Sequence, residues 1–163
     1  MHIIKIRCNQ VSSATSWRVE QVVDTDLILA KAGSIKKHLN RVFEKRETDL
    51  RTFLKDIDRQ ESILFNIQMA VQNCIDIAAH IISDQGLGVP GSTNEMFYLL
   101  EENGYLDNEI TEKMVKAVGL RNLIVHEYSK IDLDQIFEVA QKDITDLNEY
   151  LKSIFKKLDL ADK

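Results

Sequence analysis

The sequence predicts an all-α bundle of about five helices, and three observations support this fold class. Proline occurs once and glycine six times in 163 residues, so few residues interrupt a helix. Apolar residues recur at helical intervals from Asp26 to near the C-terminus. Hydrophobic residues make up 44% of the chain and charged residues 29%, which is ordinary for one globular domain with a single core.

Residues 1–23 do not share this helical period, and we assign them to an N-terminal extension of unknown order ahead of a helical domain at 24–163. The alternation from His2 to Arg7 fits a short strand, a disordered extension or sequence added for expression. No apolar stretch approaches the roughly 18 residues that a membrane-spanning helix needs, and the first residues lack the features of a secretory signal. The sequence therefore predicts a cytoplasmic protein with no membrane partner.

The first helix is expected to run for about five turns from Asp26. Its apolar stripe falls at intervals of three and four residues, at Ile28, Ala32, Ile35, Leu39 and Val42. The opposite face is cationic and carries Lys31, Lys36, Lys37, Arg41, Lys45 and Arg46. These cations could attract RNA or an acidic partner surface, but a solvated helix face is the simpler interpretation and the one we favour.

A long central helix is expected from Thr48 to Ser83, where no glycine or proline interrupts the apolar period. Three of its polar residues, Asn73, Asp76 and His80, are spaced three and four apart and therefore share one side. If that side is buried, Asp76 would orient Arg121 or His126 from a neighbouring helix. If it is exposed, Asp76 and His80 would form a weak surface pair. The sequence does not choose between the two.

The segment Gly86–Gly91 is a connector, because it has the residues of a turn but neither of the glycine patterns that bind phosphate. Ser92 and Glu95 have the spacing of a capping box at the start of the next helix. The last three helices are expected at 92–103, 108–125 and 132–158.

Charge and cysteine content exclude several classes of protein. The formal net charge is −5, which argues against indiscriminate coating of nucleic acid, so any RNA site must be local. Only Cys8 and Cys74 are present, and no cysteine or histidine cluster has the spacing of a zinc site. We expect no disulfide framework, no metal site and no cofactor, with Cys74 as a small core residue.

The segment Arg121–Tyr128 carries the pattern R-x4-H-x-Y and is the most informative part of the chain. Arg121 offers a permanent planar cation that can hold a phosphate by two hydrogen bonds. His126 is the side-chain type whose ordinary pKa, about 6.5, suits proton transfer near neutral pH. Together they could cleave RNA without a metal. The alternative is structural, with Arg121 and His126 as a surface pair and a cap residue.

Helical geometry groups these residues in two stripes. On an ideal helix Tyr128 lies about 20° from Arg121, and His126 about 40° from Asn122. Gly119 removes a side chain just before the arginine, which would let another helix or an RNA backbone come close. The exact rotation of His126 is uncertain, because the boundary of the helix is near.

The chain resembles the HepT-like branch of the HEPN superfamily, the toxin partners of minimal nucleotidyltransferases. The resemblance is carried by Gly119–Asp132, with its glycine, RN and HxY positions, and by Ile67–Pro90, which is similar to the family's central helix and turn. It covers roughly Asp26 to Leu158. Nothing in the motif departs from the family pattern.

The resemblance implies a homodimeric HEPN-type bundle, with the two R-x4-H motifs facing across a cleft. It also implies a metal-independent endoribonuclease that cleaves tRNA or mRNA through Arg121 and His126, with Asn122 and Asp76 in support. The partner nucleotidyltransferase would neutralise it, in one version by transferring AMP to Tyr128. The alternatives are a non-catalytic HEPN module that binds RNA, nucleotide or the nucleotidyltransferase, and a helical dimerisation domain without chemistry.

Overall fold

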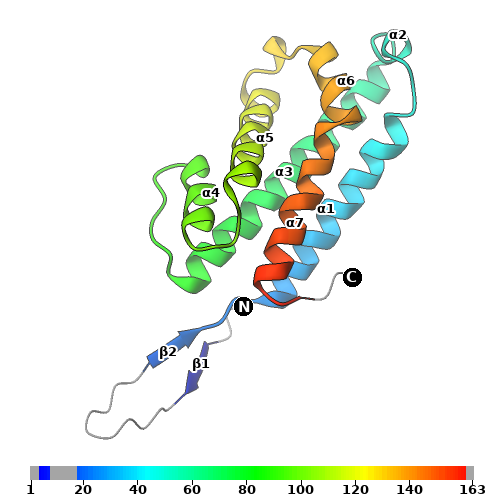
Figure 1. Cartoon of the computed structure of the whole chain (residues 1–163). Helices are drawn as coiled ribbons and strands as arrows, with labels where there is room; N and C mark the ends of the chain where they lie inside the picture. The colour runs from blue at the N-terminus through cyan, green and yellow to red at the C-terminus, as the bar shows by residue number, and fades with distance from the viewer. Residues whose placement is uncertain (1–3, 8–17, 161–163) are drawn as a thin grey trace, which may run out of the picture.

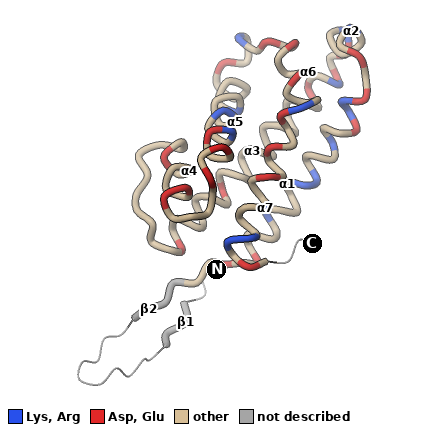
Figure 2. Tube along the Cα trace, viewed as in Figure 1, with Lys and Arg blue, Asp and Glu red and all other residues tan. Residues whose placement is uncertain are grey.

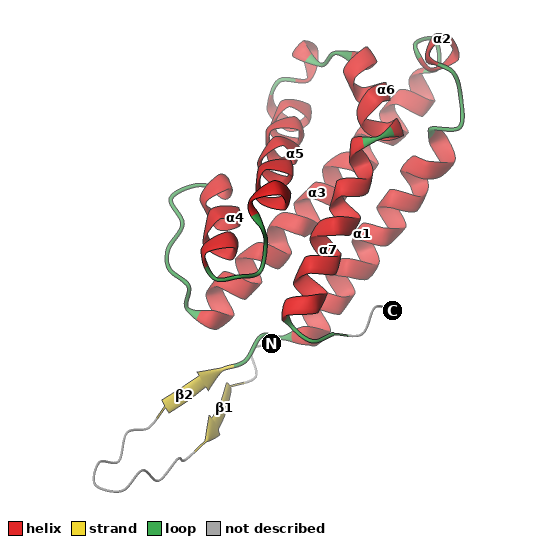
Figure 3. Cartoon of the chain, in the orientation of Figure 1, coloured by secondary structure: helices red, strands yellow, loops and turns green. Residues whose placement is uncertain are grey.

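In the computed structural model the described residues are 4–7 and 18–160, and most of them are helical (Figure 3). Seven α-helices lie in this described part: α1 Thr25–Lys45, α2 Leu50–Phe53, α3 Ile57–Gln85, α4 Thr93–Glu102, α5 Asn108–His126, α6 Leu133–Gln141 and α7 Asp146–Lys157. Two short 3-10 turns, η1 Tyr128–Lys130 and η2 Asp143–Thr145, flank α6. The all-α fold class predicted from the sequence is confirmed.

The long helices form an up-and-down bundle around α3 (Figure 1). Helix α1 runs in one direction, α3 returns beside it, α5 runs back up, and α6 and α7 descend together. Helix α3 contacts α1, α4, α5, α6 and α7, and is therefore the centre of the fold. Because α5 runs upward, its C-terminal end lies at the same end of the bundle as the start of α3.

Side-chain caps set where most of the helices begin. At the N-terminus of a helix the first backbone N–H groups have no partner within the helix, and a short polar side chain can accept from one of them, which contributes roughly 1 kcal/mol. The residues that do so are Asp24, Asp49, Asp56, Ser92, Asp107 and Asp132. The predicted cap at Ser92 is confirmed, while the Glu95 carboxylate accepts from the Gly91 N–H instead of reaching Ser92.

The central helix expected from Thr48 to Ser83 is interrupted. Asp56 leaves the helical conformation, and its carboxylate accepts from the backbone N–H of Arg59 at 3.0 Å. That cap starts α3 afresh and leaves α2 as a separate single turn. The prediction of one continuous helix was wrong because aspartate can offer the backbone a competing hydrogen bond, which an apolar pattern does not record.

The final helix expected over 132–158 is also broken, at Lys142. The Arg46 guanidinium from the end of α1 donates to the backbone carbonyls of Ala140 and Gln141, at 3.3 and 3.4 Å. The Gln141 side chain donates back to the Arg46 carbonyl at 2.8 Å. These bonds satisfy carbonyls at the end of α6 that would otherwise lack a partner, so the helix can stop there.

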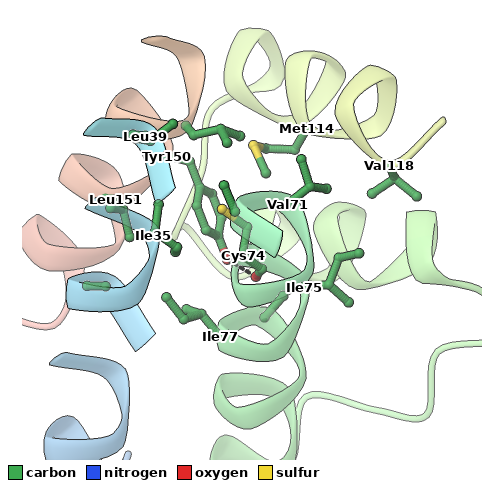
Figure 4. Close-up of a cluster of buried hydrophobic side chains, with 14 of the residues drawn as sticks. Ile35, Leu39, Val71, Cys74, Ile75, Ile77, Met114, Val118, Tyr150 and Leu151 are labelled. Carbon is green, nitrogen blue, oxygen red and sulfur yellow. Dashed lines mark hydrogen bonds between the residues drawn. The ribbon is translucent and has the colours of Figure 1, made fainter. Parts of the chain in front are cut away.

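The core gathers large aliphatic side chains from α1, α3, α5 and α7 around one buried tyrosine (Figure 4). Tyr150 is fully buried and its hydroxyl donates to the Cys74 backbone carbonyl at 3.0 Å. The Phe97 ring meets the Tyr150 ring edge-on, with centroids 5.8 Å apart. Cys74 is fully buried, as the sequence predicted, and burial raises the pKa of its thiol well above the usual range. It therefore acts as a small core residue rather than as a nucleophile.

The N-terminal segment contains an antiparallel pair of strands, β1 Ile4–Arg7 and β2 Arg18–Gln21, with Ile4 opposite Gln21. Of the possibilities left open for this end of the chain, the structure shows the short strand. His2 and Cys8 lie outside the described residues. Within the described part, no helix is long and apolar enough to cross a membrane.

Candidate functional site

The R-x4-H-x-Y segment lies at the C-terminal end of α5. The helix is held against the bundle by Met114, Val118 and Ile124, all buried. Arg121 follows Val118 by three residues and so lies near this inward stripe, which explains why only part of its side chain reaches solvent. The predicted end at Val125 is correct to within one residue, since α5 ends at His126.

Arg121 is partly buried and makes one side-chain hydrogen bond. Its Nη1 donates to Oδ1 of the neighbouring Asn122 at 3.1 Å. Its Nε is buried and has no hydrogen-bond partner among the described residues. A buried donor without an acceptor costs roughly 1–3 kcal/mol, so an anion that reached this nitrogen would recover that cost. Asn122 therefore holds one arm of the guanidinium and leaves donors for a ligand.

His126 is the last residue of α5, and its side chain is exposed. Glu127 turns out of the helix with φ −136° while its N–H still donates to the Leu123 carbonyl at 2.9 Å. Asn122 and His126 are both within α5, four residues apart, and therefore share a face as predicted.

Tyr128 opens the 3-10 turn η1, and 56% of it is exposed. The prediction that Tyr128 continues the Arg121 stripe was wrong, because the helix stops two residues earlier. Its neighbours Lys130 and Glu127 pair with each other, Lys130 donating to Glu127 at 2.8 Å. Tyr128 therefore lies in an exposed turn.

Asp76 is not part of this group. Its Oδ2 accepts from Nζ of Lys31 at 2.9 Å, and its Oδ1 accepts from the Gln72 amide at 2.9 Å. Both predicted placements, against Arg121 or His126 and against His80, were therefore wrong for the single chain. The spacing of polar residues along α3 does not show which helix packs against them, and the cation that reaches Asp76 comes from α1, the helix that α3 contacts most extensively.

A groove, which we call the α5–α6 groove, lies beside the motif and was not predicted. It encloses about 550 Å³ between α5 and the α6–α7 arm, with α3 as its floor. Its apolar lining includes Ile67, Val71, Ala117, Leu120, Leu123 and Val139. Gly119 also lines it, and a Cβ added there would meet nothing within 4 Å, which agrees with the expectation that this glycine permits close approach.

Lys113 lines the groove near the N-terminal end of α5. Its Nζ lies 3.0 Å from Glu109, 3.0 Å from Glu149 and 3.5 Å from Asp146, so it joins α5 to α7. The hydrogen bonds to Glu109 and Glu149 raise the pKa of Lys113 above its usual range, which keeps it charged. The signal that could have revealed the groove is a second apolar stripe on α5, at Ala117, Leu120 and Leu123.

Charge over the bundle is mixed. Lys and Arg are interspersed with Asp and Glu along the helices in the view of Figure 2. This distribution agrees with the net charge of −5 and means that any anionic ligand must be held by a few local cations.

The site is therefore an arginine and a histidine near the C-terminal end of one helix of an up-and-down bundle. The family model described as "Ribonuclease HepT-like" matches residues 13–154. The chain therefore belongs to the HepT-like family, and the resemblance stated from the sequence is confirmed.

Individual relatives agree with this assignment. The mRNA nuclease HepT of Shewanella oneidensis is 34% identical over 129 residues, which cover 79% of this chain and 96% of that protein. The tRNA nuclease HepT of Aphanizomenon flos-aquae is 26% identical over 132 residues, covering 81% and 90%. Among solved structures, the tri-AMPylated Shewanella oneidensis HEPN toxin in complex with MNT antitoxin matches with a TM-score of 0.75 at 34% identity, covering 80% of this chain and 98% of that one.

Proposed function

We propose that this chain is the toxin of a HEPN/MNT-type toxin–antitoxin pair and a metal-independent endoribonuclease that cleaves tRNA or mRNA. The observation that carries the proposal is the end of α5, where a partly buried Arg121, whose Nε has no partner among the described residues, stands five residues before an exposed His126. Membership of the HepT-like family and relatives named as mRNA and tRNA nucleases support the same activity.

The chemistry needs a base, an acid and a cation, and the motif supplies these types of group. His126 would take the proton from the ribose 2′-hydroxyl, or give one to the departing 5′-oxygen, each role being worth about 10²- to 10⁴-fold in rate. Arg121 would hold the scissile phosphate and stabilise the charge that develops on its oxygens. The attack of the 2′-oxygen on phosphorus, with loss of the 5′-oxygen, leaves a 2′,3′-cyclic phosphate.

One chain does not bring these groups to one point. Arg121 and His126 are five residues apart on α5, which places them about 140° apart around an ideal helix. A second copy facing the first would set the arginine of one chain against the histidine of the other, and would supply a second histidine so that acid and base roles could be divided. We therefore place the active site between two copies.

The α5–α6 groove is the surface we assign to that second copy. Its apolar lining is contiguous with the motif on α5, and Lys116 and Asp143 stand on opposite sides of it. Neither of these two exposed residues makes an ion pair with another described residue. In a two-fold symmetric contact, Lys116 of one chain can meet Asp143 of the other, so the groove is self-complementary in charge.

We further propose that a minimal nucleotidyltransferase neutralises the toxin at Tyr128. The solved Shewanella oneidensis relative is a tri-AMPylated toxin bound to its MNT antitoxin. In this chain Tyr128 is exposed and follows the motif by two residues. An adenylyl group there would add negative charge and bulk near Arg121, competing with RNA for the guanidinium.

The direct test is cleavage of end-labelled tRNA and structured mRNA in excess EDTA, with the product termini identified. Wild-type protein should give 2′,3′-cyclic phosphate ends and His126→Ala should give none. His80→Ala is the matched control, since it removes a histidine from α3 that makes no side-chain hydrogen bond with another described residue. Intact RNA with a folded wild-type dimer would contradict catalysis and favour the non-catalytic binding module.

A further inference from the structure

A second concave site lies between α1 and α3, away from the α5–α6 groove, and we call it the α1–α3 pocket. It encloses about 490 Å³, within the range typical of small-ligand sites. Its α1 wall carries Lys37, His38 and Arg41, and its α3 wall carries Asp58, Glu61 and Phe65. One wall is therefore cationic, and the other is anionic and aromatic.

The histidine in this pocket has a fixed orientation. Asn66 is buried, and its amide nitrogen donates to the Ser62 carbonyl at 2.7 Å. Its Oδ1 consequently faces His38, whose Nδ1 lies 2.9 Å away and must be the donor. In the neutral imidazole this leaves Nε2 as an acceptor. The Asn66 amide thus sets both the tautomer and the angle of the His38 ring.

Phe65 provides an open aromatic surface. It is 55% exposed, although it lies in the central helix of the bundle, in the N-terminal half of α3. The His38 ring approaches it edge-on, with centroids 6.2 Å apart and planes at 77°. An edge-on neighbour leaves a face of the ring available for a planar ligand to stack.

The four charged groups of the pocket make no ion pairs with one another or with other described residues. Lys37 and Arg41 on α1 and Asp58 and Glu61 on α3 are all exposed. Burying four such charges under a protein surface is costly, and the centres of protein interfaces are depleted in charged residues. A ligand with an anionic group could pair with the cations of the α1 wall, and N–H donors on the same ligand could pair with the carboxylates of the α3 wall.

We propose that the α1–α3 pocket binds an unpaired guanine nucleotide of single-stranded RNA. The base stacks on Phe65, and its adjacent N1–H and N2–H groups donate to the carboxylate of Asp58 or Glu61. Lys37 and Arg41 neutralise the phosphate, and Nε2 of His38 accepts from the 2′-hydroxyl. Carboxylates only accept hydrogen bonds, so they favour the base edge with two neighbouring donors.

The proposal rests on the proposed function in one respect, that the nucleotide belongs to the RNA substrate. The pocket is built from the C-terminal half of α1 and the N-terminal half of α3, at the end of the bundle where the motif also lies (Figure 1). A guanine held there would anchor the RNA at a distance from the cleavage point and select where the chain is cut.

The test measures binding by fluorescence anisotropy with full-length His126→Ala protein, which leaves the RNA intact whether or not the wild type cleaves it. The probes are a labelled single-stranded oligonucleotide with one central guanine and the same oligonucleotide with inosine, which lacks the N2 amino group. We expect the guanine oligonucleotide to bind about tenfold more tightly, and Phe65→Ala to weaken it by about tenfold. Asp58→Asn combined with Glu61→Gln should abolish the preference for guanine over inosine.

Matched controls come from the same surface. Lys45→Ala removes an exposed cation from α1 outside the pocket, and Glu44→Gln removes an exposed carboxylate there. Both should bind as the parent does. Competition by guanosine monophosphate, but not by adenosine monophosphate, would support the pocket and show that the free nucleotide also enters it.

Two results would overturn the proposal. One is equal binding of the guanine and inosine oligonucleotides with no effect of Phe65→Ala in a protein that circular dichroism shows to be folded. The other is a change in sedimentation of Phe65→Ala without a change in RNA binding, which would assign this face to a second copy of the chain.

Discussion

The two ends of α5 are built in opposite ways. Near its N-terminal end Lys113 has three carboxylate partners within 3.5 Å and ties α5 to α7. Near its C-terminal end the Arg121 side chain bonds, among the described residues, to its neighbour Asn122, and His126 and Tyr128 are exposed. Charged groups that stabilise a fold are paired with one another, whereas groups that await a ligand are left with unused hydrogen-bonding capacity. We propose that this difference separates a structural cation, Lys113, from a functional one, Arg121.

The largest effect that tests this contrast is expected at Arg121. Arg121→Lys keeps the charge but removes the planar fork and the bond to Asn122, so RNA cleavage should fall by about 10²-fold. The free energy of unfolding should change little, because a buried unpartnered Nε is removed at the same time. Cleavage rates and denaturant unfolding are compared on one preparation, and full activity in Arg121→Lys would make Arg121 a structural residue.

The next effect concerns the groove. Gly119→Phe places a ring where the backbone is open, so the chain should fold but no longer pair, and cleavage at low protein concentration should fall by about tenfold or more. Gly119→Ala is the control, since a single methyl meets no atom within 4 Å and alanine is the better helix former. Sedimentation velocity distinguishes monomer from dimer, and a dimeric, active Gly119→Phe protein would exclude the groove as the contact.

The smallest effect is expected at Lys113. Lys113→Met should lower the free energy of unfolding only slightly, because Glu109 and Glu149 are largely solvent-exposed, and should leave the rate of cleavage per dimer unchanged. Equilibrium unfolding in urea measures the free energy of unfolding, and the RNA assay measures the rate of cleavage. If Lys113→Met lost cleavage while remaining stable, Lys113 would have a functional role, and the contrast between the two ends of α5 would be wrong.

Lys113→Met should also change how the free energy of unfolding depends on pH. Burial raises the pKa of Asp146, and Lys113 partly opposes that shift. A carboxyl group with a raised folded-state pKa binds more protons when folded than when unfolded, so its contribution to stability falls as pH rises through that pKa. Without Lys113 the shift should grow, and stability should fall more steeply between about pH 3 and 6 than in the wild type. Parallel curves for the two proteins would exclude this coupling.

The sequence predicted the parts of the molecule that depend on local periodicity and on a short motif. The stripe from Ile28 to Val42 lies in the core, Cys74 is buried, Ser92 caps its helix, and α5 ends where its pattern ends. These features follow from the spacing of residues along a helix, which a sequence records directly.

The features that escaped prediction depend on contacts between distant segments. Arg46 binds the end of α6 across 94 and 95 residues of sequence, and Lys31 reaches Asp76 across 45. The α5–α6 groove depends on where α6 and α7 pack relative to α5, and no pattern within α5 specifies that. The prediction that Tyr128 lies on the Arg121 stripe was wrong for a local reason, because it assumed that the helix continues past its C-terminal cap at Glu127. Arg121 and His126 stay a prediction until their removal is measured.

The most direct test of the central claim, that two copies of the exposed end of α5 form one RNA-cleaving site, is a mixing experiment. Inactive His126→Ala is added to a fixed amount of wild type, the subunits are allowed to exchange, and cleavage is followed. If each site needs a histidine from both chains, an equimolar mixture should retain about half of the original activity, and a large excess of the variant should abolish it. Activity that stays constant as the variant is added would show that each chain works alone and would contradict the shared site.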